Sequence, residues 1–162
     1  MWEKTENILV NHKSIFKYNL QMKEYFRTYK FMGDVELSRL FDNELEKFKK
    51  QLDFDIATFV PNARSHYDYR GFDHVFEMYN RVFKLECMLE KNDIEDFQSR
   101  KSFKERVSTA QSFTVKQNQI SENSKILLID DIYTSGRTIT HAQKALNKAG
   151  YKKILTFSLV RS

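Results

Sequence analysis

The pattern of apolar and polar positions predicts strands that alternate with helices along most of the chain. Apolar runs of strand length occupy residues 54–60, 126–129 and 154–160. Apolar residues recur at helical spacing in residues 72–83 and 139–149. Because runs of consecutive apolar residues suit strands that are buried on both faces, we predict an α/β fold, a largely parallel sheet flanked by helices.

The N-terminal part is predicted to contain an extended segment and two helices. Residues 7–18 are expected to be extended, and residues 20–31 to form a short helix with an aromatic face. Residues 35–50 carry apolar side chains at helical spacing and are expected to form one amphipathic helix. Between the two, Gly33 and Asp34 are expected to break the chain and to cap the second helix.

Shorter signals complete the pattern. Residues 54–60 are expected to be the first strand of the main sheet, closed by Pro61, because proline cannot continue a central strand. Residues 113–115 are a candidate strand, and Gly150 is expected to follow the last helix as its C′ residue. Residues 91–111 have mixed charges and few large apolar groups, so we expect a mobile excursion with one short helix.

Composition indicates a single domain. The chain has 162 residues, of which 41% are hydrophobic, and no apolar run approaches the roughly 20 residues that a membrane span needs. The N-terminus lacks the apolar core of a signal peptide. The single cysteine, Cys87, excludes an intramolecular disulfide and a cysteine-based zinc cluster, and we expect it to be a packing residue. These features favour a cytoplasmic protein.

Charge is distributed unevenly around a modest net value of +5. No acidic residue follows Asp131, whereas six basic residues do: Arg137, Lys144, Lys148, Lys152, Lys153 and Arg161. This bias suits anionic ligands, either pyrophosphates or nucleic acid. A solvated basic helix face is an equally good explanation for the lysines.

The strongest candidate for chemistry is the stretch of residues 125–138. Its apolar run ends on two adjacent carboxylates, Asp130 and Asp131, and a small-residue loop then leads into a helix. The loop supplies three hydroxyl groups and a glycine: Thr134, Ser135, Thr138 and Gly136. A helix N-terminus with free N–H groups binds phosphate, and the carboxylates suit sugar hydroxyls or Mg²⁺. The stretch therefore predicts a ligand with a phosphate at one end and a diol at the other.

This stretch, ILLIDDIYTSGRT, resembles the phosphoribosyl-pyrophosphate (PRPP) motif of type I phosphoribosyltransferases. The resemblance implies a type I phosphoribosyltransferase-like fold in which Asp130 and Asp131 form the catalytic acid pair and hold the ribose 2- and 3-hydroxyls. It also implies a 5-phosphate site made by Thr134, Ser135, Gly136, Arg137 and Thr138. The alternative is an ordinary strand–loop–helix crossover with a polar turn.

Most of the chain is similar to the ComF family, which is tied to natural competence and DNA uptake in bacteria. The matching pieces are FKY at 16–18, YKFMGD at 29–34, VP at 60–61, RGFDH at 70–74 and KERVSTAQSF at 104–113. The chain has Asp73 and Thr109 where the family pattern has asparagine, and it lacks the cysteine-rich zinc segment of many relatives. The resemblance implies one domain, residues 1–162, with a hood-like part (1–53) and a core (54–162).

By the same resemblance, the loop after the strand at 54–60 would meet the pyrophosphate. Its candidate residues are Asn62, Ala63, Arg64 and Arg70. His66 and His74 lie eight residues apart, which is no trusted metal-ligand spacing, so we expect surface histidines. Tyr133 is expected either to stack on a base or to cover the site.

Two functions remain open. The first is Mg²⁺-dependent transfer at ribose C1 of PRPP to an unknown acceptor, with Mg²⁺ held through the ligand and the acid pair rather than by direct protein ligation. The second is a non-catalytic adaptor that binds single-stranded DNA or a competence helicase. Basic and aromatic residues favour the DNA reading, although a charged lid explains them equally well: Phe97, Arg100, Lys101, Phe103, Lys104 and Arg106. The oligomeric state is left open.

Overall fold

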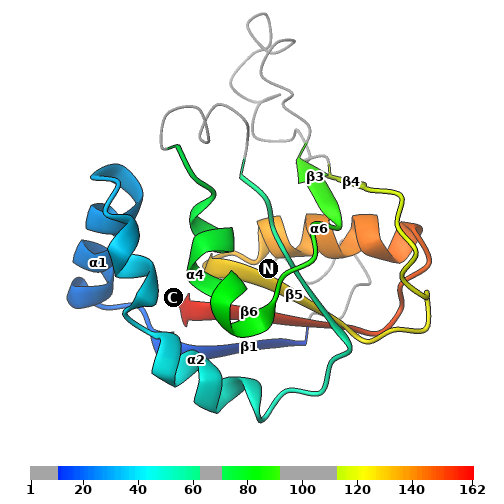
Figure 1. Cartoon of the computed structure of the whole chain (residues 1–162), viewed down its shortest axis with the longest axis horizontal. Helices are drawn as coiled ribbons and strands as arrows, with labels where there is room; N and C mark the ends of the chain where they lie inside the picture. The colour runs from blue at the N-terminus through cyan, green and yellow to red at the C-terminus, as the bar shows by residue number, and fades with distance from the viewer. Residues whose placement is uncertain (1–10, 63–70, 92–112) are drawn as a thin grey trace, which may run out of the picture.

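Among the residues that the structure describes, the centre of the molecule is a four-stranded sheet in the order β1-β6-β5-β2, and all three strand pairings are parallel. The computed structural model describes residues 11–62, 71–91 and 113–162 (Figure 1). The four strands are β1 (His12–Lys17), β2 (Ile56–Phe59), β5 (Ile126–Tyr133) and β6 (Ile154–Arg161). The expected α/β architecture with a parallel sheet is confirmed.

Both faces of this sheet are covered by apolar side chains. Along β5, Leu127 and Ile129 belong to a core with helices α1 (Leu20–Phe31), α2 (Asp42–Lys49) and α4 (His74–Phe83). Ile126 and Leu128 belong to the opposite core, with α6 (Arg137–Lys148). Successive side chains of a strand point to opposite faces, so the apolar run at 126–129 fills both cores. Complete burial of each such side chain contributes roughly 1.5–3 kcal/mol.

Side-chain caps set where two of these helices begin. Asn19 precedes α1 and accepts a hydrogen bond from the Met22 amide at 2.8 Å. Asp73 precedes α4 and accepts hydrogen bonds from the Val75 and Phe76 amides at 3.0 Å each. Asparagine and aspartate are both preferred N-caps, so either residue suits position 73.

The prediction of a single helix at residues 35–50 is wrong, because two helices occupy this range. A 3₁₀ helix, η1 (Val35–Arg39), comes first and α2 follows, and Asp34 makes no capping hydrogen bond. Arg81 on α4 donates to the Ser38 hydroxyl and forms an ion pair with Asp42, one on each side of the break. This tertiary contact spans the break, which helical spacing in the sequence does not reveal.

The first strand of the main sheet is β1, which corrects the assignment of residues 54–60 to that position. β2 is instead the edge strand at the other side of the sheet. The strand at 113–115 is confirmed as β4 (Phe113–Val115), but it pairs antiparallel with β3 (Leu89–Lys91) in a separate small sheet.

Beyond α6, Gly150 follows the helix with φ +104°, as expected for its C′ residue. The excursion expected after residue 91 lies outside the described residues. In the described ranges, no helix combines the length and the apolar composition that crossing a bilayer requires.

Candidate functional site

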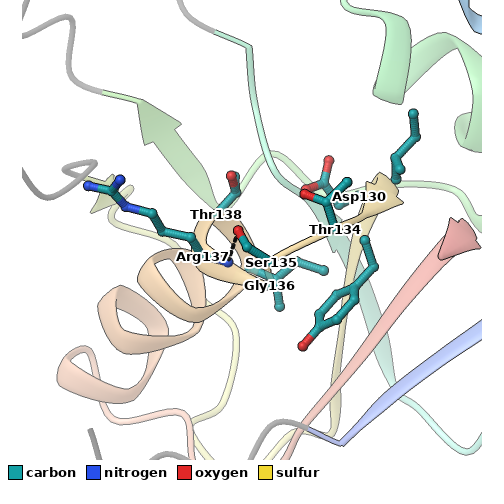
Figure 2. A pocket seen from close by; sticks show the side chains of 9 residues that line it. Asp130, Thr134, Ser135, Gly136, Arg137 and Thr138 are labelled. Carbon is teal, nitrogen blue, oxygen red and sulfur yellow. Dashed lines mark hydrogen bonds between the residues drawn. The ribbon is translucent and has the colours of Figure 1, made fainter. Parts of the chain in front are cut away.

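The candidate phosphate site lies where β5 passes through a short loop into α6 (Figure 2). Gly136 is the N-cap of α6 and has φ +70°, a conformation that favours glycine. A Cβ atom at this position would also collide with the Tyr133 ring. Both the backbone angle and the lack of space therefore require glycine at position 136.

A small pocket opens at this junction and is lined mainly by the predicted phosphate-binding residues. Its lining consists of Asp130, Ile132, Tyr133, Thr134, Ser135, Gly136, Arg137, Thr138 and Ile139. The first N–H groups of a helix lack intrahelical partners and carry the positive end of the helix dipole, so the pocket suits an anion. The Arg137 amide lies 3.5 Å from the Ser135 hydroxyl, and the Arg137 side chain extends away from Asp130 (Figure 2).

The two adjacent carboxylates have different surroundings. We expected the acid pair at the end of the strand. β5 instead continues to Tyr133, so the acid pair lies within the strand. Because neighbouring strand residues point to opposite faces, Asp130 lines the pocket whereas Asp131 is buried on the other face. The sheet itself therefore separates the two acids.

Asp131 is held by two basic side chains from different helices. Its Oδ2 forms an ion pair with Lys30 of α1 and accepts a hydrogen bond from His74 Nε2 of α4 at 2.7 Å. Its Oδ1 accepts the Ile132 amide at 2.6 Å. Burial alone would raise the pKa of Asp131, but the Lys30 charge and the His74 contact outweigh burial and hold that pKa below its usual range.

His74 is 5% exposed, so the expectation that it is a surface histidine is wrong. The side-chain amide nitrogen of Asn62 donates to His74 Nδ1 at 2.7 Å. This contact assigns the ring the Nε2–H tautomer, so Nε2 donates to Asp131. The Tyr29 hydroxyl donates to the His74 carbonyl at 2.6 Å. Lys30, Asp131, His74 and Asn62 thus form one continuous polar chain.

This polar chain joins the carboxyl ends of β2 and β5, where the two candidate loops were expected to meet. The backbone amide of Asn62 donates to Asp73 Oδ2 at 3.0 Å, which ties the residue after Pro61 to the N-cap of α4. Among the pyrophosphate-loop candidates, Ala63, Arg64 and Arg70 lie outside the described residues. The aromatic and basic residues at 97–106 and Thr109 lie outside them as well.

Asp130 is less deeply placed than Asp131. Its Oδ1 accepts the Asp131 amide at 2.9 Å, and its remaining surface borders the pocket. Burial in the protein and the neighbouring Asp131 charge both raise the pKa of Asp130 above its usual range. A partner that donates hydrogen bonds, such as a sugar hydroxyl, would be favourable beside this carboxyl group.

Tyr133 packs against His12 of β1, with ring centroids 4.0 Å apart and an interplanar angle of 24°. His12 is fixed by Thr156 and Ser158, each 2.9 Å from one of its ring nitrogens. Burial, and then the Arg161 charge, lower the pKa of His12 to about 4. One face of the Tyr133 ring is therefore occupied by protein.

No group of three or more potential ligands gathers into a metal site within the described ranges. Mg²⁺ is commonly held by one or two carboxylates together with substrate phosphates. Asp130 fits that role beside a phosphorylated ligand, while Asp131 is already paired with Lys30.

Cys87 is exposed, with its sulfur 3.9 Å from Lys116 Nζ, so the prediction of a packing role was wrong.

Lys30 and His74 were not recognised as site residues from the sequence. His74, Met78 and Val82 are spaced by four residues on α4 and all are buried, so helical spacing did contain the signal for His74. Lys30 follows the buried Tyr29, and only the position of α1 against the sheet reveals its partner.

Residues 68–162 match the family described as "Phosphoribosyl transferase domain". The chain is 40% identical to "Competence protein ComFC" of Streptococcus pneumoniae (strain ATCC BAA-255 / R6), over 99% of this chain and 72% of that protein. It is 28% identical to "Competence protein ComFC" of Bacillus subtilis (strain 168), over 96% of this chain and 66% of that protein.

Two solved structures are similar at low sequence identity. One is described as the allosteric regulatory enzyme of purine biosynthesis, with a TM-score of 0.46 and 15% identity, over 76% of this chain and 25% of the other. The second is an adenine phosphoribosyl transferase from Trypanosoma brucei, with a TM-score of 0.41 and 14% identity, over 96% and 86% of the two chains.

Proposed function

We propose that this chain, which belongs to the phosphoribosyl transferase domain family and is of the ComF type, binds the phosphorylated ribose of PRPP in the pocket at the N-terminus of α6. One observation carries the proposal: a carboxylate and three hydroxyl side chains border the same helix N-terminus. In this arrangement the 5-phosphate lies against residues 134–138, and the ribose hydroxyls lie near the acid pair.

Within the acid pair, we assign the direct ribose contact to Asp130. Asp130 lines the pocket, whereas both Asp131 oxygens accept bonds from the protein. The pKa of this half-buried carboxyl group is raised, and hydrogen bonds from hydroxyl donors stabilise it more than they would in water. Asp131 acts indirectly from the other face of the sheet: its contacts with Lys30 and His74 hold α1 and α4 against β5.

The reaction we propose is transfer at ribose C1. The bond from C1 to the pyrophosphate oxygen breaks, pyrophosphate leaves with the bonding electrons, and a nitrogen nucleophile or water forms the new bond to C1. Positive charge builds on the ring, so the protein acts by placement and by electrostatic stabilisation. Mg²⁺, when bound with the ligand, supplies charge neutralisation of the pyrophosphate.

Calorimetric titration with PRPP and with ribose 5-phosphate, each with and without Mg²⁺, tests the proposal. We expect both ligands to bind and Mg²⁺ to tighten PRPP more than ribose 5-phosphate. Thr138→Val removes a pocket hydroxyl and should weaken both ligands, while Thr140→Val, one position beyond the pocket lining, serves as the matched control. Absence of heat and of a thermal shift at millimolar ligand contradicts the proposal. Release of pyrophosphate from PRPP measures turnover.

A second candidate is an adaptor for DNA uptake that binds single-stranded DNA or a competence helicase. Two observations support it: both relatives are named competence proteins, and six basic residues with no acidic one follow Asp131. Fluorescence anisotropy with a labelled oligonucleotide, across a salt series, tests DNA binding, which should weaken steeply as salt rises. Displacement of the oligonucleotide by PRPP would indicate a shared site.

A further inference from the structure

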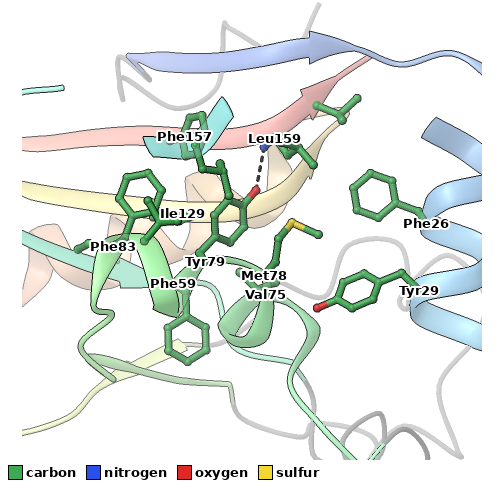
Figure 3. Packing of buried hydrophobic residues seen from close by; sticks show 14 of the residues in the cluster. Phe26, Tyr29, Phe59, Val75, Met78, Tyr79, Phe83, Ile129, Phe157 and Leu159 are labelled. Carbon is green, nitrogen blue, oxygen red and sulfur yellow. Dashed lines mark hydrogen bonds between the residues drawn. The ribbon is translucent and has the colours of Figure 1, made fainter. Parts of the chain in front are cut away.

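Tyr79 of α4 places a hydroxyl group in the middle of the sheet. Its side chain is fully buried, and its ring packs edge-on against Phe157 of β6, with ring centroids 5.9 Å apart (Figure 3). The ring belongs to the core that α4 shares with the sheet. A phenylalanine would fill the same apolar space, so the hydroxyl needs its own explanation.

The hydroxyl bonds to two neighbouring strands at the level of the acid pair. It donates to the Asp130 carbonyl of β5 at 3.0 Å and accepts the Leu159 amide of β6 at 2.9 Å. In the register, Asp130 pairs with Ser158 and Ile132 pairs with Val160, while the intervening Leu159 is not paired with β5. In a regular parallel ladder, the Leu159 amide would donate directly to the Asp130 carbonyl. The Tyr79 hydroxyl therefore bridges the two strands beside the position of that ladder bond.

We propose that Tyr79 is a positioning residue for ribose binding: its bridging hydroxyl fixes the main chain at Asp130 and so sets the direction of the Asp130 carboxylate in the pocket. This inference rests on the proposed function. Asp130 is the residue whose carbonyl receives the hydroxyl and whose side chain lines the pocket. A shift of its main chain therefore moves the carboxylate as well.

The chemistry of the hydroxyl suits a permanent bridge. Burial is the main cause that raises the pKa of Tyr79 well above its ordinary value, so the group remains a protonated donor at physiological pH. A buried hydroxyl without partners is costly, and here both of its roles are used, one as donor and one as acceptor.

Tyr79→Phe tests the proposal because it removes only the hydroxyl. Tyr151→Phe is the matched control: Tyr151 is also buried, and its hydroxyl also has two partners, Asn118 and Ile120, but it belongs to the opposite core. Each variant is titrated with ribose 5-phosphate and, separately, with inorganic phosphate. We expect Tyr79→Phe to weaken ribose 5-phosphate binding by about tenfold, on the scale of one lost hydrogen bond, and to leave phosphate binding unchanged. Tyr151→Phe should change neither.

The amide of Leu159 gives a second readout that needs no ligand. In Tyr79→Phe, this amide loses the hydroxyl as an acceptor, so its NMR shift and hydrogen exchange should change together with the shifts at Asp130. Unchanged resonances at both residues overturn the proposal.

The binding outcomes separate the two proposals. A Tyr79→Phe variant that binds ribose 5-phosphate within twofold of the wild type overturns the role of Tyr79 alone. Equal weakening of ribose 5-phosphate and phosphate also overturns it, because it indicates general damage to the site. A wild-type protein that binds neither ligand overturns the proposed function, and the role of Tyr79 in ribose binding falls with it.

Discussion

The ammonium group of Lys30, on α1, forms a buried ion pair with the carboxylate of Asp131, on β5. The two residues lie 101 positions apart in the chain, and their side chains are only 17% and 8% exposed. The pair links the N-terminal helix directly to the strand that carries the acid pair. Because an unpaired charge in a largely buried position destabilises the fold, loss of either group should leave the other destabilising.

Lys30→Met should destabilise the fold by roughly 3 kcal/mol, because it removes the lysine counter-ion of Asp131 and leaves only the contacts with His74 and the Ile132 amide. Urea unfolding measures the change. Arg27→Met is the control on the same helix: Arg27 pairs with Glu24 on the surface, and its loss should cost less than about 0.5 kcal/mol. Equal effects of the two substitutions would mean that the Lys30–Asp131 pair has no special role.

Asp130→Asn and Asp131→Asn should differ in their effects on ligand affinity and on melting temperature. Asp130→Asn should weaken ribose 5-phosphate binding at least about tenfold with little change in melting temperature, because Asp130 lines the pocket. Asp131→Asn should lower the melting temperature strongly, because Lys30 loses its counter-ion. Calorimetry and thermal unfolding of both variants measure the split. Loss of affinity without loss of stability in Asp131→Asn would make Asp131 a ribose ligand.

Gly136→Ala should abolish phosphate binding as well as reduce stability. A left-handed alanine costs about 1–2 kcal/mol, and the added Cβ would also displace the Tyr133 ring, which lines the pocket. Gly33→Ala is the control, since Gly33 has nearly the same φ, +72° against +70°, but no atom within 4 Å of the new Cβ. It should lose similar stability and keep its ligand affinity. Titration with inorganic phosphate distinguishes the two; equal affinities would contradict the clash.

Stability should fall as pH drops from 6.5 to about 4, in part because of His12. Its pKa is lowered from 6.5 to about 4, first by burial and then by Arg161. In this window the unfolded chain binds a proton at His12 that the folded chain does not, so acid favours unfolding, and above pH 6.5 the contribution vanishes. His12→Asn should flatten the curve of unfolding free energy between these pH values. An NMR titration that finds the His12 ring near 6.5 would contradict this.

The strand, loop and helix around Asp130 were predictable because their signals are local. The apolar run, the acid pair, the hydroxyl loop and the helical spacing all lie between residues 125 and 149. Residues 20–31 were likewise assigned to a helix with the bounds observed for α1. In each case the pattern of neighbouring residues is enough to select the local structure.

The contacts between distant elements could not be predicted in this way. β1 has the polar sequence HKSIFK, and its place in the sheet depends on pairing with β6 and on bonds from His12 to Thr156 and Ser158. Helical spacing can place His74 on the buried face of α4, but it does not identify the partners of the two ring nitrogens, which come from β5 and from the residue after Pro61. Such roles follow from the assembly of the fold and not from neighbours in the chain.

The sheet order has a consequence for how the protein is made. β6 lies between β1 and β5, so an interior strand of the main sheet is synthesised after every other strand that the structure describes. Until it emerges, β1 lacks the partner it has in the described sheet, and one edge of β5 presents unpaired backbone groups. Such pairings between distant parts of a chain form slowly, and open strand edges attract other chains. The nascent chain therefore exposes open strand edges until this eight-residue strand has emerged, and the pairing of β6 with β1 and β5 then closes the sheet.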